Sequence, residues 1–336
     1  MKYDIAFYEV FTEEEELLRT YLPAGYRYFF TSKSIQDTDT DNLPAPVIST
    51  RTQSRIPLGW ADQLSAIFTR STGFDHLTAY FRKASHAVPA GYLPRYAARA
   101  VAEQAFLLML MLLRKMDLQR QAIRRFSRDG LTGSELRGKT LSIIGVGNIG
   151  SEIARIGYGM EMSLLGVDLV EREEISESYD LQYVELAQAV ARCRILVCAL
   201  PLTDATDRML NYQILSGAHP EAILINIARG EIAPPEDLLR LLKEDKLAGA
   251  GLDVYDQESV LGSYLRGELT PDNLSDQERR TLRANQKLLE HPKVIATPHN
   301  AFNTRESTDR KSQKTAQNIK AFLEQGAFLT PLPVSV

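Results

Sequence analysis

The sequence has few cysteines and no cluster of basic residues. Its 336 residues include two cysteines, Cys193 and Cys198, in the apolar stretch ARCRILVCAL. In a strand these two side chains point to opposite faces, which argues against a disulfide or a metal-binding pair and favours two small core residues in a reducing compartment. The net charge is −4 and there is no basic stripe. We therefore expect neither nucleic acid nor an anionic membrane surface as a partner.

Long apolar segments are also missing. The most apolar run, AFLLMLMLL at 105–113, is too short to span a bilayer. It predicts a helix over 101–113 that is buried on all sides, at a domain or subunit interface. The first residues carry acids where a signal peptide needs a continuous apolar region, so a cytoplasmic protein is expected. The length favours two domains over one.

Short apolar runs alternate with amphipathic ones from residue 139 onward. Such alternation indicates parallel strands whose sheet is covered by helices on both faces. The runs predict strands at 140–145, 163–168, 195–200, 222–228, 248–254 and 294–297.

The remaining segments are less regular. The first hundred residues hold strand candidates at 4–10 and 45–50. The patterns at 236–245 and 304–325 predict helices, the second ending at Gly326. A long polar segment follows Glu258, and its Ser275–Glu278 stretch is a capping box that opens another helix.

The segment GVGNIG at 145–150 matches the dinucleotide-binding fingerprint. It follows an expected strand and opens an expected helix, which is the context that this motif needs. Gly145 permits the tight turn, Gly147 lets the backbone approach a pyrophosphate, and Gly150 lets the helix pack on the strand. The helix N-terminus, with Asn148 and Ile149, then offers N–H groups to the phosphates.

Asp168 ends the second strand of this βαβ unit, eighteen positions after Gly150. A carboxylate there accepts hydrogen bonds from both ribose hydroxyls and repels a 2′-phosphate. The sequence therefore predicts NAD rather than NADP as the cofactor.

Three motifs lie at the carboxyl ends of further expected strands, where open α/β sheets bind ligands. They are INIARG (225–230), GLDVYDQE (251–258) and ATPHNAF (296–302). With these motifs the chain resembles the D-isomer-specific 2-hydroxyacid dehydrogenases, and Arg229, Glu258 and His299 match that family's catalytic Arg, Glu and His. The resemblance runs along nearly the whole chain.

The chemistry explains these residue types. Arg229 offers a planar fork to the carboxylate and carbonyl oxygens of a 2-oxo acid. His299 would be the general acid that protonates the developing alkoxide, and Glu258 would orient its ring and favour the imidazolium by its negative charge. No group of His, Cys, Asp and Glu has metal-ligand spacing, so no metal is expected.

By the resemblance, the fold is two Rossmann-like, doubly wound parallel-sheet domains with the active site in the cleft between them. The substrate domain comprises 1–98 and 301–336, and the NAD-binding domain comprises 99–300. The family is usually dimeric, and helix 101–113 is the expected interface. Further cofactor contacts are expected from Leu200, Pro201, Thr206, Ile227, Ala228 and Asp253.

Three details resemble the D-lactate dehydrogenase branch. The backbone N–H groups of Thr72 and Gly73, in RSTGFD (70–75), would hold the substrate carboxylate. Tyr96 and Phe302 would wall the pocket for a small apolar substituent such as the methyl of pyruvate. Core packing is the alternative reading of both aromatic residues.

Some positions depart from the family pattern. Ala199 replaces a histidine found in many relatives, and the Pro234–Pro235 pair replaces a polar helix start, which we expect to affect only the cap. Arg51 would favour a second anionic group if it faced the cleft, although a solvated surface arginine is the simpler expectation.

Two other functions stay open. One is a dehydrogenase of a phosphorylated or hydroxylated acid, such as 3-phosphoglycerate, glycerate or 4-phosphoerythronate. The other is a binding protein that senses NAD(H) without turnover.

Overall fold

The protein was analysed as a computed structural model that describes residues 1–333. Its internal contacts divide the chain into two compact units, one of residues 1–97 together with the stretch that begins at Asn303, the other of Ala98–Phe302. Contacts delimit the units without assigning their roles, so the substrate and NAD assignments made from the sequence stay predictions.

The first unit is built on a five-stranded sheet in the order β2-β1-β3-β4-β5, and all its pairs are parallel. Its strands are β1 (Ile5–Phe7), β2 (Tyr28–Phe30), β3 (Val47–Thr50), β4 (Ala66–Thr69) and β5 (Ala90–Gly91), and its helices are α1 (Thr12–Tyr21), α2 (Asp75–Phe81) and α12 (Arg305–Gln325), with 3₁₀ turns η1 (Ile35–Asp37) and η2 (Leu58–Trp60). Every residue of β1, β3 and β4 is buried, because helices cover both faces of a parallel sheet.

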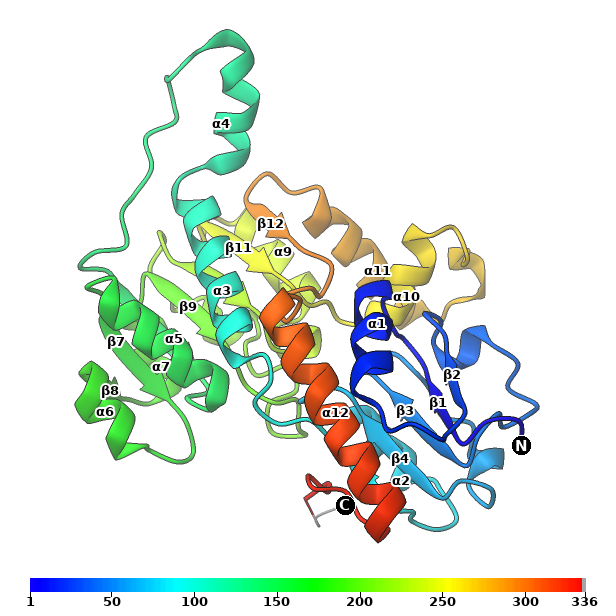
Figure 1. Cartoon of the computed structure of the whole chain (residues 1–336). Coiled ribbons are helices and arrows are strands. Elements are labelled where there is room, and N and C mark those ends of the chain that lie inside the picture. The colour runs from blue at the N-terminus through cyan, green and yellow to red at the C-terminus, as the bar shows by residue number, and fades with distance from the viewer. Residues whose placement is uncertain (334–336) are drawn as a thin grey trace. The chain divides into compact units, whose positions relative to one another are not determined.

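The end of the chain returns to this unit as α12. The helix begins after Thr304, whose side chain accepts from the Ser307 N–H, and ends at Gly326 in the left-handed conformation (φ 74°), as predicted. It packs along α1 (Figure 1).

The second unit is built on a seven-stranded parallel sheet in the order β12-β11-β10-β9-β6-β7-β8. The order reverses between β6 and β9, which is the arrangement of a doubly wound nucleotide-binding sheet. The strands are β6 (Thr140–Ile144), β7 (Ser163–Val167), β8 (Leu181–Tyr183), β9 (Ile195–Cys198), β10 (Ile223–Asn226), β11 (Gly249–Leu252) and β12 (Val294–Ala296). All six strands predicted after residue 139 are present, and the predicted fold class of two parallel α/β sheets is confirmed.

The helices of the second unit connect these strands and cover the sheet. They are α3 (Ala98–Leu113), α4 (Met116–Ala122), α5 (Asn148–Gly159), α6 (Glu173–Tyr179), α7 (Leu186–Arg192), α8 (Tyr212–Leu215), α9 (Pro235–Lys243), α10 (Glu258–Leu265) and α11 (Asp276–Leu289), with 3₁₀ turns η3 (Ile123–Arg125), η4 (Gly230–Ile232) and η5 (Pro271–Asn273). The capping box predicted at Ser275 and Glu278 opens α11. Pro235 is the first residue of α9, where its missing N–H costs nothing.

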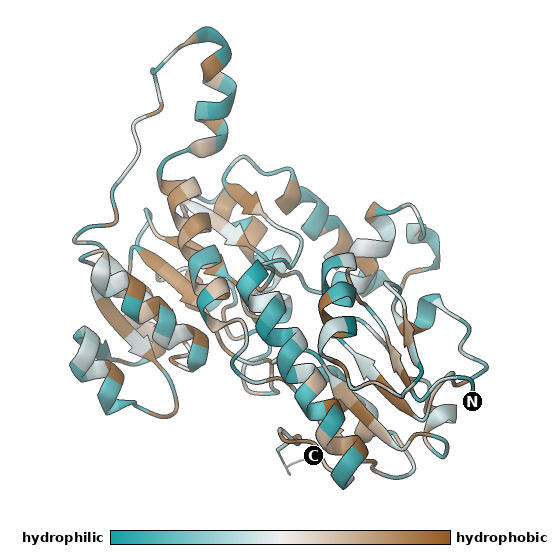
Figure 2. Ribbon diagram, in the orientation of Figure 1, coloured by the Kyte–Doolittle hydropathy of each residue, from teal (hydrophilic) through white to brown (hydrophobic). Residues whose placement is uncertain are grey.

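The expectation that the helix over 101–113 is buried on all sides was wrong. The run at 105–113 lies in a helix that packs against α5 and β11, and most of the helix is apolar (Figure 2). It is not buried on all sides, however, because Glu103 is exposed and Leu107 is 48% exposed. The apolar run predicted more burial than the structure shows, because one strip of α3 faces away from the sheet.

The two cysteines are buried free thiols, as expected. Only Cys198 lies in a strand, while Cys193 follows α7.

Candidate active site

The glycine loop lies between β6 and α5, at the point where the strand order of the second unit reverses. Gly145 has φ 97°, and a Cβ there would lie 2.8 Å from the carbonyl oxygen of Ala199. At Gly150 a Cβ would lie 2.0 Å from the carbonyl oxygen of Gly145. At Gly147, which caps α5, a Cβ would meet nothing within 4 Å. Two glycines thus close the turn, and the third leaves open space at the N-terminus of α5.

Asp168 follows β7 and faces this loop. Its Oδ2 accepts from the Val146 N–H at 2.7 Å, and its Oδ1 accepts from the Val170 N–H at 3.1 Å. The carboxylate therefore fixes the glycine loop and keeps further lone pairs for ribose hydroxyls. Asn148 and Ile149 stand in the first turn of α5, where helix N–H groups lack intrahelical partners.

The segment after β9 carries three of the predicted cofactor residues. Leu200 is half-buried and Pro201 is exposed. The Thr206 hydroxyl donates to the Pro201 carbonyl at 2.7 Å and accepts from the Thr203 N–H at 2.8 Å, which closes a compact turn.

The segment after β10 presents Arg229 in extended backbone (φ −141°). Asn226, at the end of β10 and 1% exposed, accepts from the Ala228 N–H at 3.1 Å and donates to the Arg229 carbonyl at 2.9 Å. Ile227 and Ala228 are buried between them. Asn226 was not among the residues expected from the sequence, although an asparagine at the end of an apolar strand was a usable signal.

The His299 imidazole meets the Glu258 carboxylate, with 2.8 Å between Nδ1 and Oε2. The two side chains are 24% and 22% exposed. Glu258 opens α10, and its Oε1 accepts from the Tyr255 N–H at 3.1 Å. His299 itself has φ 51°, a conformation uncommon for a residue with a Cβ. Because Nδ1 is bonded to the Glu258 carboxylate, the predicted proton transfer to a substrate would use Nε2.

Asp253 holds the loop that carries His299. Its Oδ1 accepts from the Thr297 hydroxyl at 2.6 Å and from the Asn300 N–H at 2.9 Å, and its Oδ2 accepts from the Ala301 N–H at 2.9 Å. Burial raises the pKa of this carboxyl, although the three hydrogen bonds act in the opposite direction. The structure thus gives Asp253 a positioning role, and its predicted contact with the cofactor stays a prediction.

Another acidic residue lies beside Arg229. Burial raises the pKa of Glu231 to about 7, and the nearby Asp256 and Glu258 carboxylates also raise it, while Arg229 lowers it. Asn285 of α11 donates to the Asp256 carbonyl at 2.8 Å and so ties the polar segment after Glu258 to the site. Neither Glu231 nor Asn285 was expected from the sequence.

The predicted substrate residues fall in both units. Thr72 is exposed, and its hydroxyl donates to the Leu93 carbonyl at 3.0 Å, while the Gly73 carbonyl accepts from the Ser71 hydroxyl at 2.7 Å. Tyr96 is 5% exposed, and its carbonyl accepts from Arg310. Phe302, at the end of the second unit, is 7% exposed. Their contact with a substrate stays a prediction.

Arg51 is not a freely solvated arginine. It is partly buried, and its guanidinium lies 4.6 Å from the centre of the Phe11 ring. Whether it faces a substrate stays untested.

Within residues 1–333, no group of three or more His, Cys, Asp or Glu side chains is placed to hold a metal ion. No helix within the same residues has the length and apolar character needed to cross a membrane.

The chain is similar to known proteins in sequence and in fold. Residues 106–301 match the model of the D-isomer specific 2-hydroxyacid dehydrogenase, NAD binding domain. An aromatic 2-oxoacid reductase of Clostridium sporogenes is 32% identical, covering 70% of this chain and 68% of that one. A D-lactate dehydrogenase of Streptococcus agalactiae is 30% identical, covering 80% and 78%. The structure of D-lactate dehydrogenase from Aquifex aeolicus, complexed with NAD and lactic acid, has a TM-score of 0.82 at 27% identity, covering 97% of this chain and 99% of that chain.

Proposed function

Because the chain belongs to the D-isomer-specific 2-hydroxyacid dehydrogenase family, we propose that it reduces a small 2-oxo acid, pyruvate or one of similar size, to the D-2-hydroxy acid with NADH. The observation that carries the proposal is the contact between the His299 imidazole and the Glu258 carboxylate. Glu258 and His299 follow strands β11 and β12 of a nucleotide-binding sheet. Strand β11 lies next to β10, the strand that precedes Arg229.

The second unit suits NAD. The open space at Gly147, the first turn of α5 and the Asp168 carboxylate would receive the pyrophosphate and the adenosine ribose. Bound NADH supplies the hydride for the carbonyl carbon of the substrate.

The chain's own residues would supply the rest of the chemistry. Arg229 would hold the substrate carboxylate and carbonyl oxygen with its planar fork. Nε2 of His299 would give a proton to the oxygen of that carbonyl as negative charge develops there. Glu258 would keep the ring in one orientation and stabilise the imidazolium. Asp253 would hold the His299 loop in its unusual conformation.

The proposed substrate is a small acid. The relatives named above are a D-lactate dehydrogenase and an aromatic 2-oxoacid reductase, which by their names differ in substrate size. The Aquifex protein bound to lactic acid is similar along 97% of this chain, which favours the smaller acid. We propose that Tyr96 and Phe302 leave room for a small apolar substituent only.

The test is the initial rate of NADH oxidation across a panel of 2-oxo acids. The panel runs from glyoxylate and pyruvate through branched and aromatic acids to hydroxypyruvate and a phosphorylated member. The highest kcat/KM is expected for pyruvate or another small apolar acid. A preference for the phosphorylated member would replace the proposed substrate class and give Arg51 a role in binding it. Tight NADH binding without turnover of any member would support an NAD(H) sensor instead.

We further propose that two copies of the chain form a dimer through the second unit. Residues 114–134 form an arm that stands apart from the rest of this unit, with α4 near its tip (Figure 1). None of the α4 residues is buried, and Ile123 and Phe126 are 63% and 75% exposed. A pocket of about 450 Å³ lies at the base of the arm, lined in part by Met111, Leu112 and Ile295. Exposed apolar side chains on the arm and a partly apolar pocket at its base suit a second copy.

Sedimentation velocity tests the dimer. Phe126→Asp should shift the protein from dimer to monomer, while a matched change at an exposed polar position of the arm, Arg124→Asp, should shift it less. A wild-type protein that sediments as a monomer would refute the dimer proposal. It would leave the proposed reaction untouched.

A further inference from the structure

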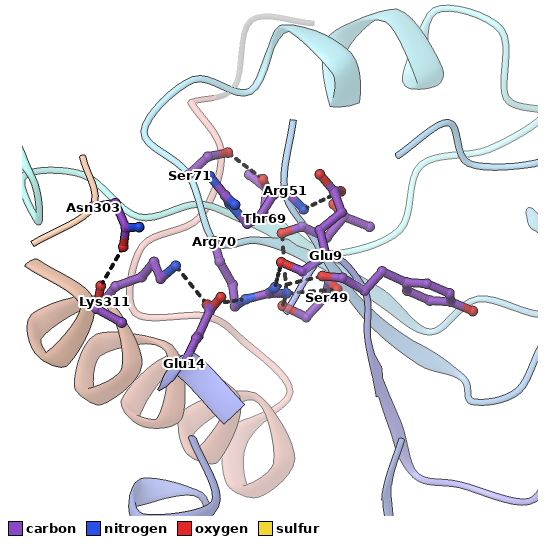
Figure 3. Close-up of polar contacts among 12 residues, drawn as sticks. Glu9, Glu14, Ser49, Arg51, Thr69, Arg70, Ser71, Asn303 and Lys311 are labelled. Atoms are coloured by element: carbon purple, nitrogen blue, oxygen red, sulfur yellow. Dashed lines mark hydrogen bonds and ion pairs between the residues drawn. The ribbon is translucent and has the colours of Figure 1, made fainter. Parts of the chain in front are cut away.

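The carboxyl ends of three strands in the first unit surround one buried guanidinium. Arg70 follows β4 directly and is 0% exposed. Its Nη1 donates to the Ser49 carbonyl at 3.0 Å and to the Ser49 hydroxyl at 3.1 Å. Its Nη2 donates to the Tyr8 carbonyl at 2.6 Å and to the Glu9 carbonyl at 3.3 Å. One side chain thus connects the ends of β1, β3 and β4 (Figure 3).

The position of this guanidinium in the sheet is informative. The strand order of the first unit reverses between β1 and β3, and such a reversal is where an open α/β sheet usually leaves a crevice for a ligand. The carbonyls that accept from Arg70 lie at the carboxyl ends of both strands, Tyr8 after β1 and Ser49 in β3. A protein side chain therefore lies where a ligand would lie in other doubly wound sheets.

The counter-charge of Arg70 comes from a helix. Glu14 of α1 is 0% exposed, and its Oε1 lies 2.9 Å from Arg70 Nε and 3.0 Å from Nζ of Lys311 on α12. Burial acts to raise the pKa of Glu14, but the Arg70 and Lys311 charges outweigh it and hold the pKa at about 2. Two buried basic side chains thus share one carboxylate, and its loss would leave the Arg70 charge uncompensated.

A second carboxylate extends this arrangement to the loop after β3. Glu9 has φ 57° and is 8% exposed. Its carboxylate accepts from the N–H groups of Arg51, Gln53 and Ser54 at 2.9, 3.0 and 3.1 Å. Glu9 therefore holds the loop after β3 through its carboxylate and accepts a hydrogen bond from Arg70 through its carbonyl.

Arg70 also opens the loop expected to bind the substrate. Ser71 comes next, and its hydroxyl shares a hydrogen bond of 2.6 Å with the Thr69 hydroxyl and donates to the Gly73 carbonyl at 2.7 Å. The backbone at Thr72 and Gly73 is thus connected to Arg70 through one residue. A shift of the Arg70 backbone would therefore be passed on to these two N–H groups.

We propose that Arg70 is a positioning residue for substrate binding, with Glu14 as its counter-charge, and that it sets the backbone of residues 70–73 by tying three strand ends together. Lysine cannot replace Arg70, because one ammonium group cannot reach both the Ser49 carbonyl and the Tyr8 carbonyl, which accept from different nitrogens of the guanidinium. The contact of this loop with substrate rests on the proposed function above.

The first test is Arg70→Lys, with Arg27→Lys as the matched control. Arg27 pairs with Asp4 in the same unit, but its side chain is 64% exposed. In Arg70→Lys we expect the KM for the 2-oxo acid to rise about tenfold or more, with a smaller fall in kcat and an unchanged Kd for NADH. Amide hydrogen exchange should become faster in peptides covering 50–54 and 70–73 and stay unchanged in peptides of the second unit. Arg27→Lys should change none of these.

The second test removes the carboxylate that balances the charge of Arg70. Glu14→Gln should raise the KM as Arg70→Lys does, because the Arg70 guanidinium loses its carboxylate. The double variant Glu14→Gln/Lys311→Met should recover part of that loss, since it also removes the buried amine that loses its partner. A structural role without a link to substrate binding would lower Tm in both variants without a selective rise in KM.

The outcomes separate the two proposals. If the wild type turns over no 2-oxo acid, the proposed function fails, and hydrogen exchange at 70–73 in Arg70→Lys still decides the positioning role. Should Arg70→Lys not fold, Glu14→Gln with the same measurements decides it. An unchanged KM together with unchanged exchange at 70–73, in a folded variant, would overturn the proposal.

Discussion

Glu258→Gln removes the negative charge beside His299 and changes little else. The amide oxygen of glutamine can still accept from the Tyr255 N–H, as Oε1 does now at 3.1 Å. Its NH₂ group would then face Nδ1 of His299 and require that nitrogen to be an acceptor. The variant would thus favour a neutral ring that carries its proton on Nε2 and disfavour the imidazolium.

The size of the effect follows from the contact. Nδ1 and Oε2 are 2.8 Å apart, and the side chains are 24% and 22% exposed. Two unit charges at this 2.8 Å separation and an effective dielectric constant of ~20 interact by about 6 kcal/mol, which sets an upper bound. A hydrogen bond to a charged group contributes about 1.5–3 kcal/mol. Because about 1.4 kcal/mol corresponds to a tenfold change in rate, kcat should fall roughly 10- to 100-fold.

The assay is NADH oxidation at saturating 2-oxo acid, together with the reverse reaction and a direct NADH titration. Both kcat values should fall, and the Kd for NADH should not change, because Glu258 is expected to act only through His299. The matched control is Glu268→Gln, an exposed glutamate paired with Arg266, which should leave kcat unchanged. A kcat for Glu258→Gln within about twofold of wild type would refute the role assigned to the pair.

Substitutions elsewhere test the other assigned roles. Arg229→Lys should raise the KM for the 2-oxo acid and lower kcat/KM about 100-fold in steady-state kinetics, because an ammonium loses the bidentate contact; an unchanged KM would contradict the assignment. Asp168→Ala should weaken NADH binding about tenfold and reduce discrimination against NADPH, measured as the ratio of the two Kd values. Burial lowers the pKa of Lys311 from 10.5 to about 7, although Glu14 acts to raise it. Between these values the folded state binds fewer protons than the unfolded state, so the free energy of unfolding should rise with pH in this range. Urea denaturation at about pH 7 and about pH 9 should show a smaller rise in Lys311→Met than in wild type.

The second unit was largely predictable because its signals are local. A parallel strand buried on both faces needs a continuous apolar run, and each run after residue 139 became a strand. The glycine loop was equally visible, since the backbone at Gly145 and Gly150 leaves no room for a Cβ. The contact between His299 and Glu258 joins residues 41 positions apart, and the resemblance to a known family, rather than periodicity, brought them together.

The first unit was less predictable because its stabilising contacts are polar and distant in sequence. The first half of α12 reads as a solvated helix, yet Ser307, Lys311, Ser312 and Thr315 are fully buried. For Lys311 the partner is the carboxylate of Glu14, which lies in another helix nearly three hundred residues earlier. Hydrophobic periodicity has no means of detecting such a pair.

The division of the chain has a consequence for biosynthesis. Residues 98–302 are continuous, so the nascent chain can complete the second unit before translation ends. The first unit receives α12, and with it Lys311, only after residue 302 has been made. Until then, the face of α1 that packs against α12 has no cover. Residues 1–97 emerge from the ribosome before the second unit but are therefore expected to reach their native state after it, with this face of α1 exposed in the meantime.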